Sequence, residues 1–443
     1  MHPTFKWKWH IVLKLKEKTS AEIMLLEAGR TGCGPELSVS GHAVKPLRQE
    51  VFEAVRAAGQ ISRIDIAKKL SVSPGSVTSI TSDLLTAGLV VEVEGTRHDG
   101  ALRGRPPVAL SIAPGAGYVV GLKLGDFEHS AVVVDFAGAI VAKLDLRKPL
   151  SSKEVSALIA QAEGLLADLL TQAGIERSQI RAVGLGLAGI VDFEAGMVPW
   201  SPLFRERDVQ LRELISVRIG LPVYVDNDAN MVTLAELWFG AGRSKSSFAV
   251  VTIEHGVGMG LVIDNRLYRG AMGLGMELGH TKVHLDGALC RCGNRGCLEA
   301  YVADYALVRE ARVALDMDSE APGQMLTMLE RLFDQAKAGN EQARSIFHRA
   351  ARYLSLALSN IVHLFDPDLI ILSGERMRYD YLYAEEVLAE MEQMTLDNGR
   401  PPPKVETHVW DGFVWARGAA ALALSAVTDE TFGEAWSEAL AEA

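Results

Sequence analysis

Three cysteines and a histidine in the C-terminal half of the chain have the types and spacing of metal ligands. Cys290, Cys292 and Cys297 follow a Cys-x-Cys-x4-Cys pattern, and His280 precedes the first of them by ten residues. Cysteines this close in sequence cannot easily bridge one another, whereas three thiolates and an imidazole suit tetrahedral Zn²⁺. Four protein ligands leave no open coordination position, so we expect one structural Zn²⁺ per chain; the alternative is a set of reduced free thiols. The fourth cysteine, Cys33, lies far from this cluster and is predicted to be an ordinary thiol.

Composition and charge restrict the classes of protein to which the chain can belong. The 443 residues, 48% of them apolar, are enough for two or three domains with substantial cores. No run approaches the ~20 uninterrupted apolar residues of a membrane-spanning helix, and the start lacks a signal-peptide pattern, so we expect a cytoplasmic protein. The net charge of −11 is uneven: residues 1–110 hold 15 basic and 11 acidic residues, and the remainder holds 30 and 45. A mildly basic head on an acidic body fits a nucleic-acid-binding module joined to another domain.

The N-terminal quarter has the pattern of a winged helix-turn-helix. Apolar residues at helical spacing predict three short helices, and Ser62 and Ser73 are the expected N-caps of the second and third. The predicted apolar stripe of the third helix is Val77, Ile80 and Leu84. Strands are predicted at 89–94 and 108–112, with a turn between them. We assign this module to residues 44–113, after a poorly ordered arm over 1–43.

A DNA-binding role would divide the module's polar residues into two groups. If the N-terminal part of the third helix enters a major groove, its outer face would meet base edges. That face consists of Gly75, Ser76, Thr78, Ser79 and Ser82. Phosphate or minor-groove contacts are predicted for Arg63, Lys68, Lys69, Arg97, Arg103 and Arg105. The alternatives are hydroxyl groups that merely solvate a helix face, and a winged helix that contacts other proteins.

The remaining chain has the pattern of two successive strand-rich lobes. Strands are predicted at 118–124, 130–136, 140–146 and 180–187, with a helix over 155–169 before the last of them, and again at 248–253, 260–264 and 369–372. A repeated order of strands and helices predicts an α/β protein with a central cleft, and ligands of such proteins bind between the lobes.

Several motifs of this body closely resemble the ROK family of repressors, open reading frames and sugar kinases. The motifs are Gly186-Leu187-Ala188-Gly189, Asp226-Asn227-Asp228-Ala229-Asn230, Gly256-Val257-Gly258-Met259-Gly260, Met276-Glu277-Leu278-Gly279-His280-Thr281, the cysteine-rich run over 290–299, and Trp415-Ala416-Arg417-Gly418-Ala419-Ala420. The resemblance covers residues 45–425, including the winged helix that the family's regulators carry. It implies a two-lobed fold of the actin-like, ribonuclease-H-like sugar-kinase type over residues 114–443, with a structural zinc site.

The resemblance also implies which residues contact a sugar. They are Gly189, Asn227, Asp228, Glu277, His280 and Glu299. Carboxylates accept pairs of hydrogen bonds from vicinal hydroxyls, and an Asn amide both donates and accepts. Gly189 would let the backbone approach the sugar, and His280 would use one ring nitrogen for the metal and the other for a hydroxyl.

Whether such a body is a kinase depends on its phosphate-binding turns. The family's kinases carry an Asp-x-Gly-Gly-Thr-Lys-like hairpin, whereas this chain has Lys123-Leu124-Gly125-Asp126-Phe127-Glu128. The second phosphate loop reads Glu254-His255-Gly256, which again places a carboxylate where phosphates need donors. Asp228, the general base in the kinases, is retained and would be vestigial.

These observations predict a sugar-responsive transcriptional regulator with a catalytically silent body. The expected action is repression of carbohydrate-metabolism genes. Its expected partners are operator DNA, a sugar or sugar derivative, and a second or further copies of the chain in a homodimer or homotetramer, with no membrane partner. One alternative is an active ATP-dependent hexose kinase or a bifunctional kinase-regulator. Another is a structural zinc protein whose winged helix contacts proteins.

Overall fold

The computed structural model describes residues 32–37, 45–94, 108–315, 325–374, 385–397 and 399–433. They form two compact units. The larger unit contains the described residues of 32–250, 259–277 and 411–433, and the smaller unit contains those of 251–258 and 278–410. Within the described part of the chain, no helix is both long and apolar enough to cross a bilayer.

The larger unit begins with three helices and a small antiparallel sheet, which supply the elements predicted for the N-terminal module. They are α2 (Leu47–Ala58), β1 (Ile61–Ser62), α3 (Arg63–Leu70), α4 (Pro74–Thr86), β2 (Val90–Glu94) and β3 (Val108–Ile112), with sheet order β1-β3-β2. Both predicted caps are present: the Ser62 hydroxyl accepts from Asp65 N and the Ser73 hydroxyl from Ser76 N. The two-residue strand β1 was not predicted, because so short a segment has no periodicity.

The buried stripe of α4 differs from the prediction at one position. Val77, Thr81 and Leu84 are buried, whereas Ile80 is only half-buried. Thr81 is tolerated in the core because its hydroxyl has partners there: it accepts from Arg63 Nε at 3.0 Å and donates to the Thr78 carbonyl at 3.1 Å.

Two five-stranded sheets share one strand order. The first sheet contains β4 (Tyr118–Leu124), β5 (Glu128–Asp135), β6 (Ile140–Arg147), β7 (Ile180–Leu187) and β10 (Val223–Asn227), in the order β10-β7-β4-β5-β6. The second contains β11 (Phe248–Ile253), β12 (Val257–Ile263), β13 (Arg266–Tyr268), β14 (Leu369–Ser373) and β15 (Lys404–His408), in the order β13-β12-β11-β14-β15. In each sheet the first strand along the chain is central, the second and third lie on one side of it, and the fourth and fifth lie on the other. The repeated topology agrees with the repeat predicted from sequence.

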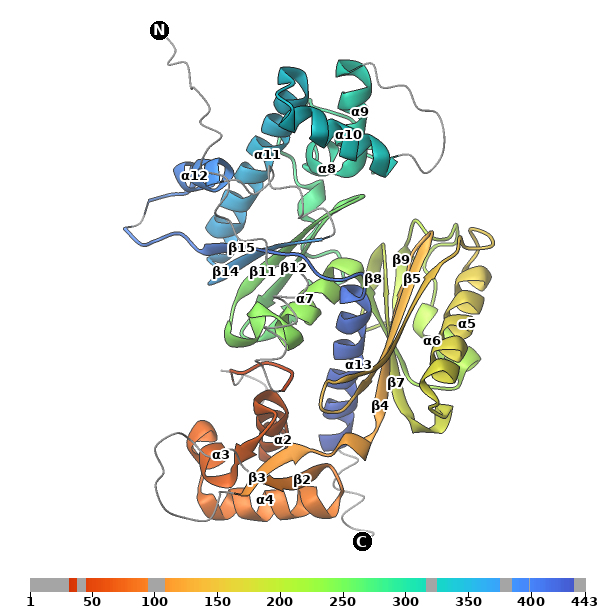
Figure 1. Ribbon diagram of the computed structural model, residues 1–443, viewed down its shortest axis with the longest axis vertical. Helices are drawn as coiled ribbons and strands as arrows, with labels where there is room; N and C mark the ends of the chain where they lie inside the picture. The colour runs from red at the N-terminus through yellow and green to blue at the C-terminus, as the bar shows by residue number, and fades with distance from the viewer. Residues whose placement is uncertain are drawn as a thin grey trace. The chain divides into compact units, whose positions relative to one another are not determined.

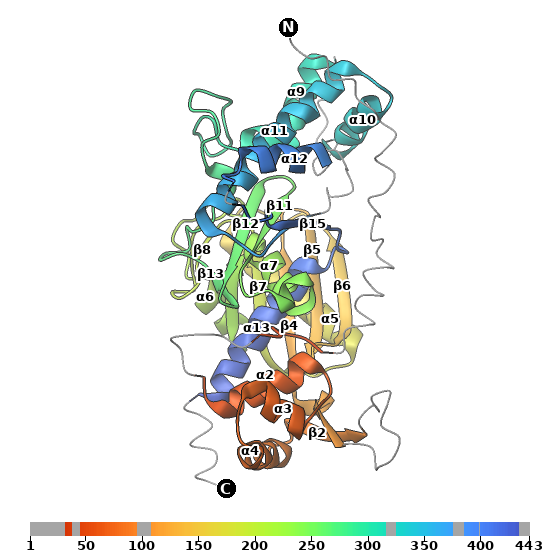
Figure 2. The same ribbon diagram turned by 90° about the vertical axis from the view of Figure 1, so that its left-hand side faces the viewer.

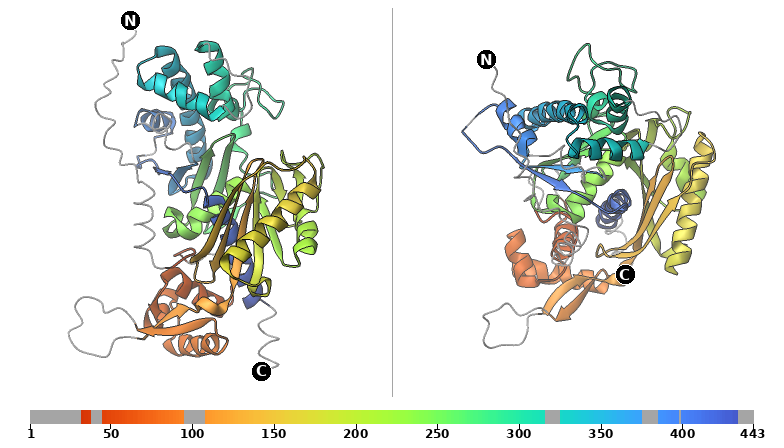
Figure 3. Two further views of the ribbon diagram at one scale, coloured as in Figure 1. Left: turned by 45° about the vertical axis from the view of Figure 1, so that its right-hand side comes forward. Right: turned by 45° about the horizontal axis from the view of Figure 1, so that its top comes forward.

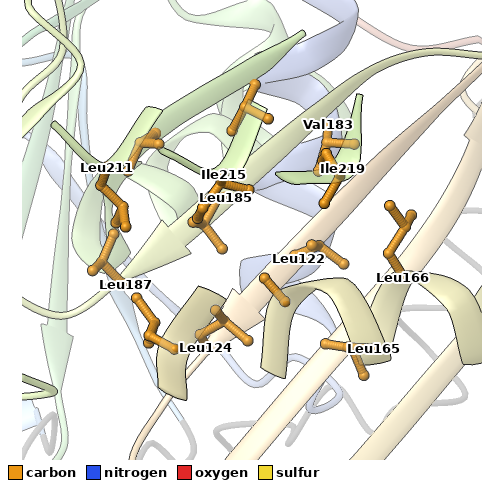
Figure 4. Close-up of a cluster of buried hydrophobic side chains, with 14 of the residues drawn as sticks. Leu122, Leu124, Leu165, Leu166, Val183, Leu185, Leu187, Leu211, Ile215 and Ile219 are labelled. Atoms are coloured by element: carbon orange, nitrogen blue, oxygen red, sulfur yellow. The ribbon is translucent and has the colours of Figure 1, made fainter. Parts of the chain in front are cut away.

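Helices cover both faces of the first sheet, within the larger unit (Figure 1). On one face, α5 (Val155–Ala173) and α6 (Leu211–Ile219) enclose an apolar core with the strands (Figure 4). On the other face lies α13 (Val414–Phe432), so that α5 (yellow) and α13 (blue) are separated by the sheet (Figure 3). Gly121 and Gly184, which are register partners, allow this approach, since a Cβ on either would lie within 2 Å of a carbonyl oxygen of α13.

Shorter elements complete the two units. The larger unit also contains β8 (Ile190–Asp192), β9 (Met197–Trp200), α7 (Asp228–Phe239) and the 3₁₀ turn η4 (Ala241–Ser244). The smaller unit adds the 3₁₀ turn η5 (Leu278–His280), α8 (Glu299–Val302), α9 (Asp304–Ala314), α10 (Met325–Lys337), α11 (Glu341–Phe365) and α12 (Glu385–Met394).

One part of the predicted arm is packed against the larger unit. Residues 32–37 are described, and Cys33 is 2% exposed. This segment was predicted to be poorly ordered because it has no periodicity and contains several Gly and Pro residues. Its partners lie far away along the chain, so the sequence gives no sign of the packing. Residues 1–31 and 38–44 of the arm lie outside the described part of the protein.

Candidate metal centre and sugar-binding residues

The four predicted metal ligands lie together in the smaller unit. One ligand atom from each of His280, Cys290, Cys292 and Cys297 lies within 4.8 Å of the others. Cys290 Sγ is 3.7 Å from His280 Nδ1, and Cys292 Sγ is 3.7 Å from Cys297 Sγ. A tetrahedral metal with Zn–S bonds of about 2.3 Å has edges of about 3.8 Å between its sulfur ligands. The cluster can therefore hold a tetrahedral metal ion without large movements of its side chains.

Polar side chains surround the cluster and connect it to Glu299. Lys282 Nζ donates to Cys297 Sγ at 2.9 Å, and the Tyr305 hydroxyl lies 3.5 Å from Cys290 Sγ and 3.4 Å from Glu299 Oε1. The second oxygen of Glu299 accepts from Val257 N at 3.4 Å. A metal ion that fixes the cysteine loop would thus also fix Glu299, which begins α8. Neither Lys282 nor Tyr305 belongs to a motif, so the sequence gives no signal for their place beside the cluster.

In the larger unit, predicted sugar contacts lie at the carboxyl ends of neighbouring parallel strands. Strands β7 and β10 pair in parallel up to Leu187 and Asn227, and ligands of α/β sheets bind at such ends. Asn227 caps α7 by accepting from Asn230 N at 2.8 Å, and Asp228 is the first residue of that helix. Gly189 follows β7 with a φ of +135°, and a Cβ there would lie 2.3 Å from the Trp200 carbonyl oxygen.

An ion pair between a buried carboxylate and a partly exposed arginine supports the loop that carries these groups. Asp226 is 1% exposed, and its Oδ2 accepts from Arg269 Nε at 2.6 Å. Its Oδ1 accepts from Asn227 N and from Asn230 Nδ2, while the guanidinium of Arg269 lies 4.0 Å from the centre of the Phe193 ring. The sequence displays Asp226 only as part of a motif and gives no signal for its distant partner Arg269.

Lys123 gives the retained Asp228 an unusual environment. Burial raises the pKa of the Asp228 carboxyl group, and the positive charge of Lys123 opposes that shift. The Lys123 ammonium also lies 5.1 Å from the centre of the Trp415 ring. On the turn between β4 and β5, Asp126 forms an ion pair with Lys153. These residues place two lysines and a carboxylate around the hairpin that resembles, in position, the phosphate-binding turn expected in a kinase.

The predicted sugar residues are divided between the units. Gly189, Asn227, Asp228 and Glu277 belong to the larger unit, and His280 and Glu299 belong to the smaller. Met276, which precedes Glu277, has a φ of +69°, a conformation that costs free energy for a residue with a side chain.

The predicted DNA contacts of the third helix are all exposed on α4. They are Gly75, Ser76, Thr78, Ser79 and Ser82. Lys68 and Lys69 are both exposed; Lys68 lies 3.7 Å from Asp65, and partial desolvation lowers the pKa of Lys69. Arg63 is bound within the module, because its guanidinium donates to Thr81 and, at 2.8 Å, to Glu92. Arg97, Arg103 and Arg105 lie outside the described residues.

Comparisons with known proteins identify similar regulators and kinases. The profile of the ROK family matches residues 119–426. The xylose repressor of Caldicellulosiruptor bescii is 29% identical over 344 residues, which span 74% of this chain and 82% of the repressor. The glucokinase of Streptomyces coelicolor is 32% identical over 268 residues, which span 58% of this chain and 82% of the kinase. A crystal structure of a ROK family transcriptional regulator, homologous to the MLC protein of E. coli, has a TM-score of 0.72 and 25% identity, and covers 87% of this chain and 97% of that one.

Proposed function

Because the chain belongs to the ROK family, we propose that it is a sugar-responsive transcriptional regulator and that it represses carbohydrate-metabolism genes. The observation that carries this proposal is the extent of the match to the known regulator structure, 87% of the chain. That coverage exceeds what residues 119–426 and those after them can supply, so it includes residues of the N-terminal module. The glucokinase match spans only 58% of the chain.

We propose that residues 44–113 form a winged helix-turn-helix that binds operator DNA, with the exposed polar face of α4 toward base edges. Lys68 would contact a phosphate, and each phosphate neutralised contributes about 0.9 to the slope of log affinity against log salt. Lys68→Ala should therefore flatten the slope by about 1 on DNA selected by the protein from a random pool. The matched control is Lys148→Ala, which removes an exposed charge outside the module. Equal slopes for both variants would contradict the assigned contact.

The proposed effector is a sugar or sugar derivative, held by hydroxyl acceptors that include Asn227, Asp228, Glu277 and Glu299. Glu277 provides the test, because it is not part of the metal cluster. Glu277→Ala should still bind the selected DNA but should no longer change its affinity when the effective sugar is added. The sugar is identified beforehand from a panel that includes D-xylose and D-glucose, by its effect on the melting temperature of the wild type. A wild-type response in the variant would refute the assigned role.

We further propose that the metal is Zn²⁺, one per chain, and that the protein acts as a homodimer or homotetramer. Three thiolates and one imidazole support this choice, because soft ligands in tetrahedral geometry favour zinc over magnesium or calcium. Two copies would place two α4 helices on half-sites separated by about one helical turn of DNA or a multiple of it.

An active hexose kinase is the second candidate, because Asp228, which the resemblance implies as the base for a sugar hydroxyl, is present at the start of α7. Lys123 opposes this candidate: it supplies a fixed cation beside Asp228 where the family's kinases carry an acidic residue. ATP turnover measured with the same sugar panel separates the two. Turnover that Asp228→Asn abolishes would establish the kinase, and DNA binding by the same sample would then make the protein bifunctional.

A further inference from the structure

Residues 32–37 connect the C-terminal end of α7 to the C-terminal end of α2. Gly34 N donates to the Trp238 carbonyl at 2.9 Å, and Cys33 N donates to the Arg56 carbonyl at 3.1 Å. Trp238 belongs to α7 and Arg56 to α2, and the Arg56 guanidinium lies 4.5 Å from the centre of the Trp238 ring. The segment therefore bonds to both helices through its backbone.

Arg243, which lies on η4 just after α7, holds residues 32–37 in place through its side-chain contacts. It is 1% exposed, so its charge must be satisfied by nearby groups. Its Nε donates to the Gly34 carbonyl at 2.9 Å, a terminal nitrogen donates to the Ala57 carbonyl at 2.5 Å, and another lies 3.7 Å from Glu36 Oε1. Glu36 N in turn donates to the Arg243 carbonyl at 2.8 Å. One side chain thus bonds both residues 32–37 and the last turn of α2.

The opposite end of α7 carries two of the proposed sugar contacts. Asn227 caps the helix and Asp228 is its first residue, and the twelve residues of α7 span about 18 Å. Residues 229–238 of the helix are all buried. A buried helix moves as a rigid body, because a close-packed interior does not deform continuously. A displacement of its first turn would therefore reach Trp238 and Arg243.

The α2 helix also rests on the end of α13 (Figure 2). Gln49 Nε2 donates to Asp429 Oδ1 at 2.6 Å, and the ring centres of Phe52 and Phe432 are 5.1 Å apart. These contacts hold α2 on the larger unit independently of Arg243. Loss of the Arg243 contacts should therefore loosen only the connection from α7.

We propose that α7, together with Arg243 and the docked residues 32–37, is the element that transmits sugar binding to the DNA-binding module, with Arg243 as a positioning residue. The proposal rests on the proposed function, since it needs both a sugar site and a DNA site. A ligand shifts a conformational equilibrium only by its differential affinity for the two states. Through the contacts of Arg243 and Gly34, a movement of α7 would change the free energy of holding α2 in its present position.

Two variants weaken this connection from opposite sides. Arg243→Ala removes the guanidinium. Gly32→Ala leaves Arg243 intact but adds a Cβ about 2.5 Å from three backbone atoms of residues 56–59, at a φ of +109° that disfavours a side chain. The matched controls are Arg218→Ala, which removes an exposed arginine, and Gly115→Ala, whose Cβ has no neighbour within 4 Å.

The readouts are DNA affinity with and without the effective sugar, sugar affinity alone, and alkylation of Cys33 followed by mass spectrometry. In the wild type, sugar should change DNA affinity by a factor in the usual range of about 5 to 150. In Arg243→Ala and Gly32→Ala this factor should fall toward unity while sugar still binds, and Cys33 should react faster. Both controls should keep the wild-type factor and a protected Cys33.

The outcomes distinguish this proposal from the proposed function. If the wild type itself binds DNA equally with and without sugar, the proposed function fails. If the wild type responds and both variants keep the full response, or if Cys33 stays protected in both, the role of α7 and Arg243 is wrong. Hydrogen exchange on the wild type tests the same point without any variant: sugar should change the exchange of the Cys33 and Gly34 amides, and unchanged rates would overturn the proposal.

Discussion

Replacing Arg269 by Met should destabilise the larger unit by about 3 kcal/mol, because it leaves the buried carboxylate of Asp226 without its cation, although the Arg269 side chain itself is 22% exposed. Asp226 is 1% exposed, and its Oδ2 accepts from Arg269 at 2.6 Å. Without the guanidinium, that oxygen loses a charge-assisted hydrogen bond on a side chain that is almost fully buried. The change also removes the contact of the guanidinium with the Phe193 ring, 4.0 Å away, which a Met thioether replaces only in part, so the single substitution alone does not isolate the ion pair.

A double-mutant cycle with Asp226→Asn isolates this interaction. The amide keeps the shape of the side chain and, through its oxygen, the bond from Asn227 N, but it removes the buried charge. In that background Arg269→Met should cost only about 1 kcal/mol, which leaves a coupling energy of about 2 kcal/mol. Urea unfolding followed by tryptophan fluorescence gives the four free energies. If the two single changes add within about 0.5 kcal/mol, the ion pair does not support the loop as argued.

Three further predictions test other parts of the two units. Cys292→Ser should lower bound zinc well below one ion per chain and make the loop before α8 sensitive to proteolysis; metal analysis that finds no zinc in the folded wild type would refute the site. Met276→Gly should stabilise the protein by up to about 1 kcal/mol. A residue with a side chain costs about 1–2 kcal/mol in the left-handed conformation, and the larger entropy that glycine loses on folding offsets part of the gain; a lower melting temperature would contradict this prediction. Lys123→Met should raise the pKa of Asp228 further, so that sugar binding is lost at a higher pH on acidification than in the wild type; identical pH profiles would show that Lys123 does not act on Asp228.

Local patterns predicted the three N-terminal helices and seven of the ten strands in the two five-stranded sheets, but not β10, β13 or β15. Ser62 and Ser73 cap the helices that they were expected to cap, since a hydroxyl before an apolar stripe bonds the free amides of its own helix. The metal cluster could also be predicted from the sequence, because three of its ligands lie in a single short turn and must therefore be close in space. The repeated sheet topology followed from a repeated order of hydrophobic segments.

The features that sequence analysis missed depend on partners distant in the chain. Arg243 and Gly34 are 209 positions apart, and no periodicity links a glycine-rich segment to a buried arginine. The burial of Thr81 in place of Ile80 has a similar cause, since it depends on a hydrogen bond from Arg63 on the preceding helix. A polar residue enters a core only where a partner meets it, and that partner is visible only in three dimensions.

In a regulator of the proposed kind, Lys123 would direct the free energy of sugar binding to a conformational change and away from catalysis. Burial raises the pKa of Asp228, and the Lys123 ammonium counteracts part of that rise, so Lys123 favours the carboxylate form that would accept from a sugar hydroxyl. A site that binds a hydroxyl without completing phosphoryl transfer does not spend binding free energy on a transition state. That free energy is then available to favour one conformation over another, to the extent that the two conformations differ in sugar affinity. Asp228 begins α7, so the residue that would be the base of a kinase lies at the start of the helix that we propose as the link to the DNA-binding module.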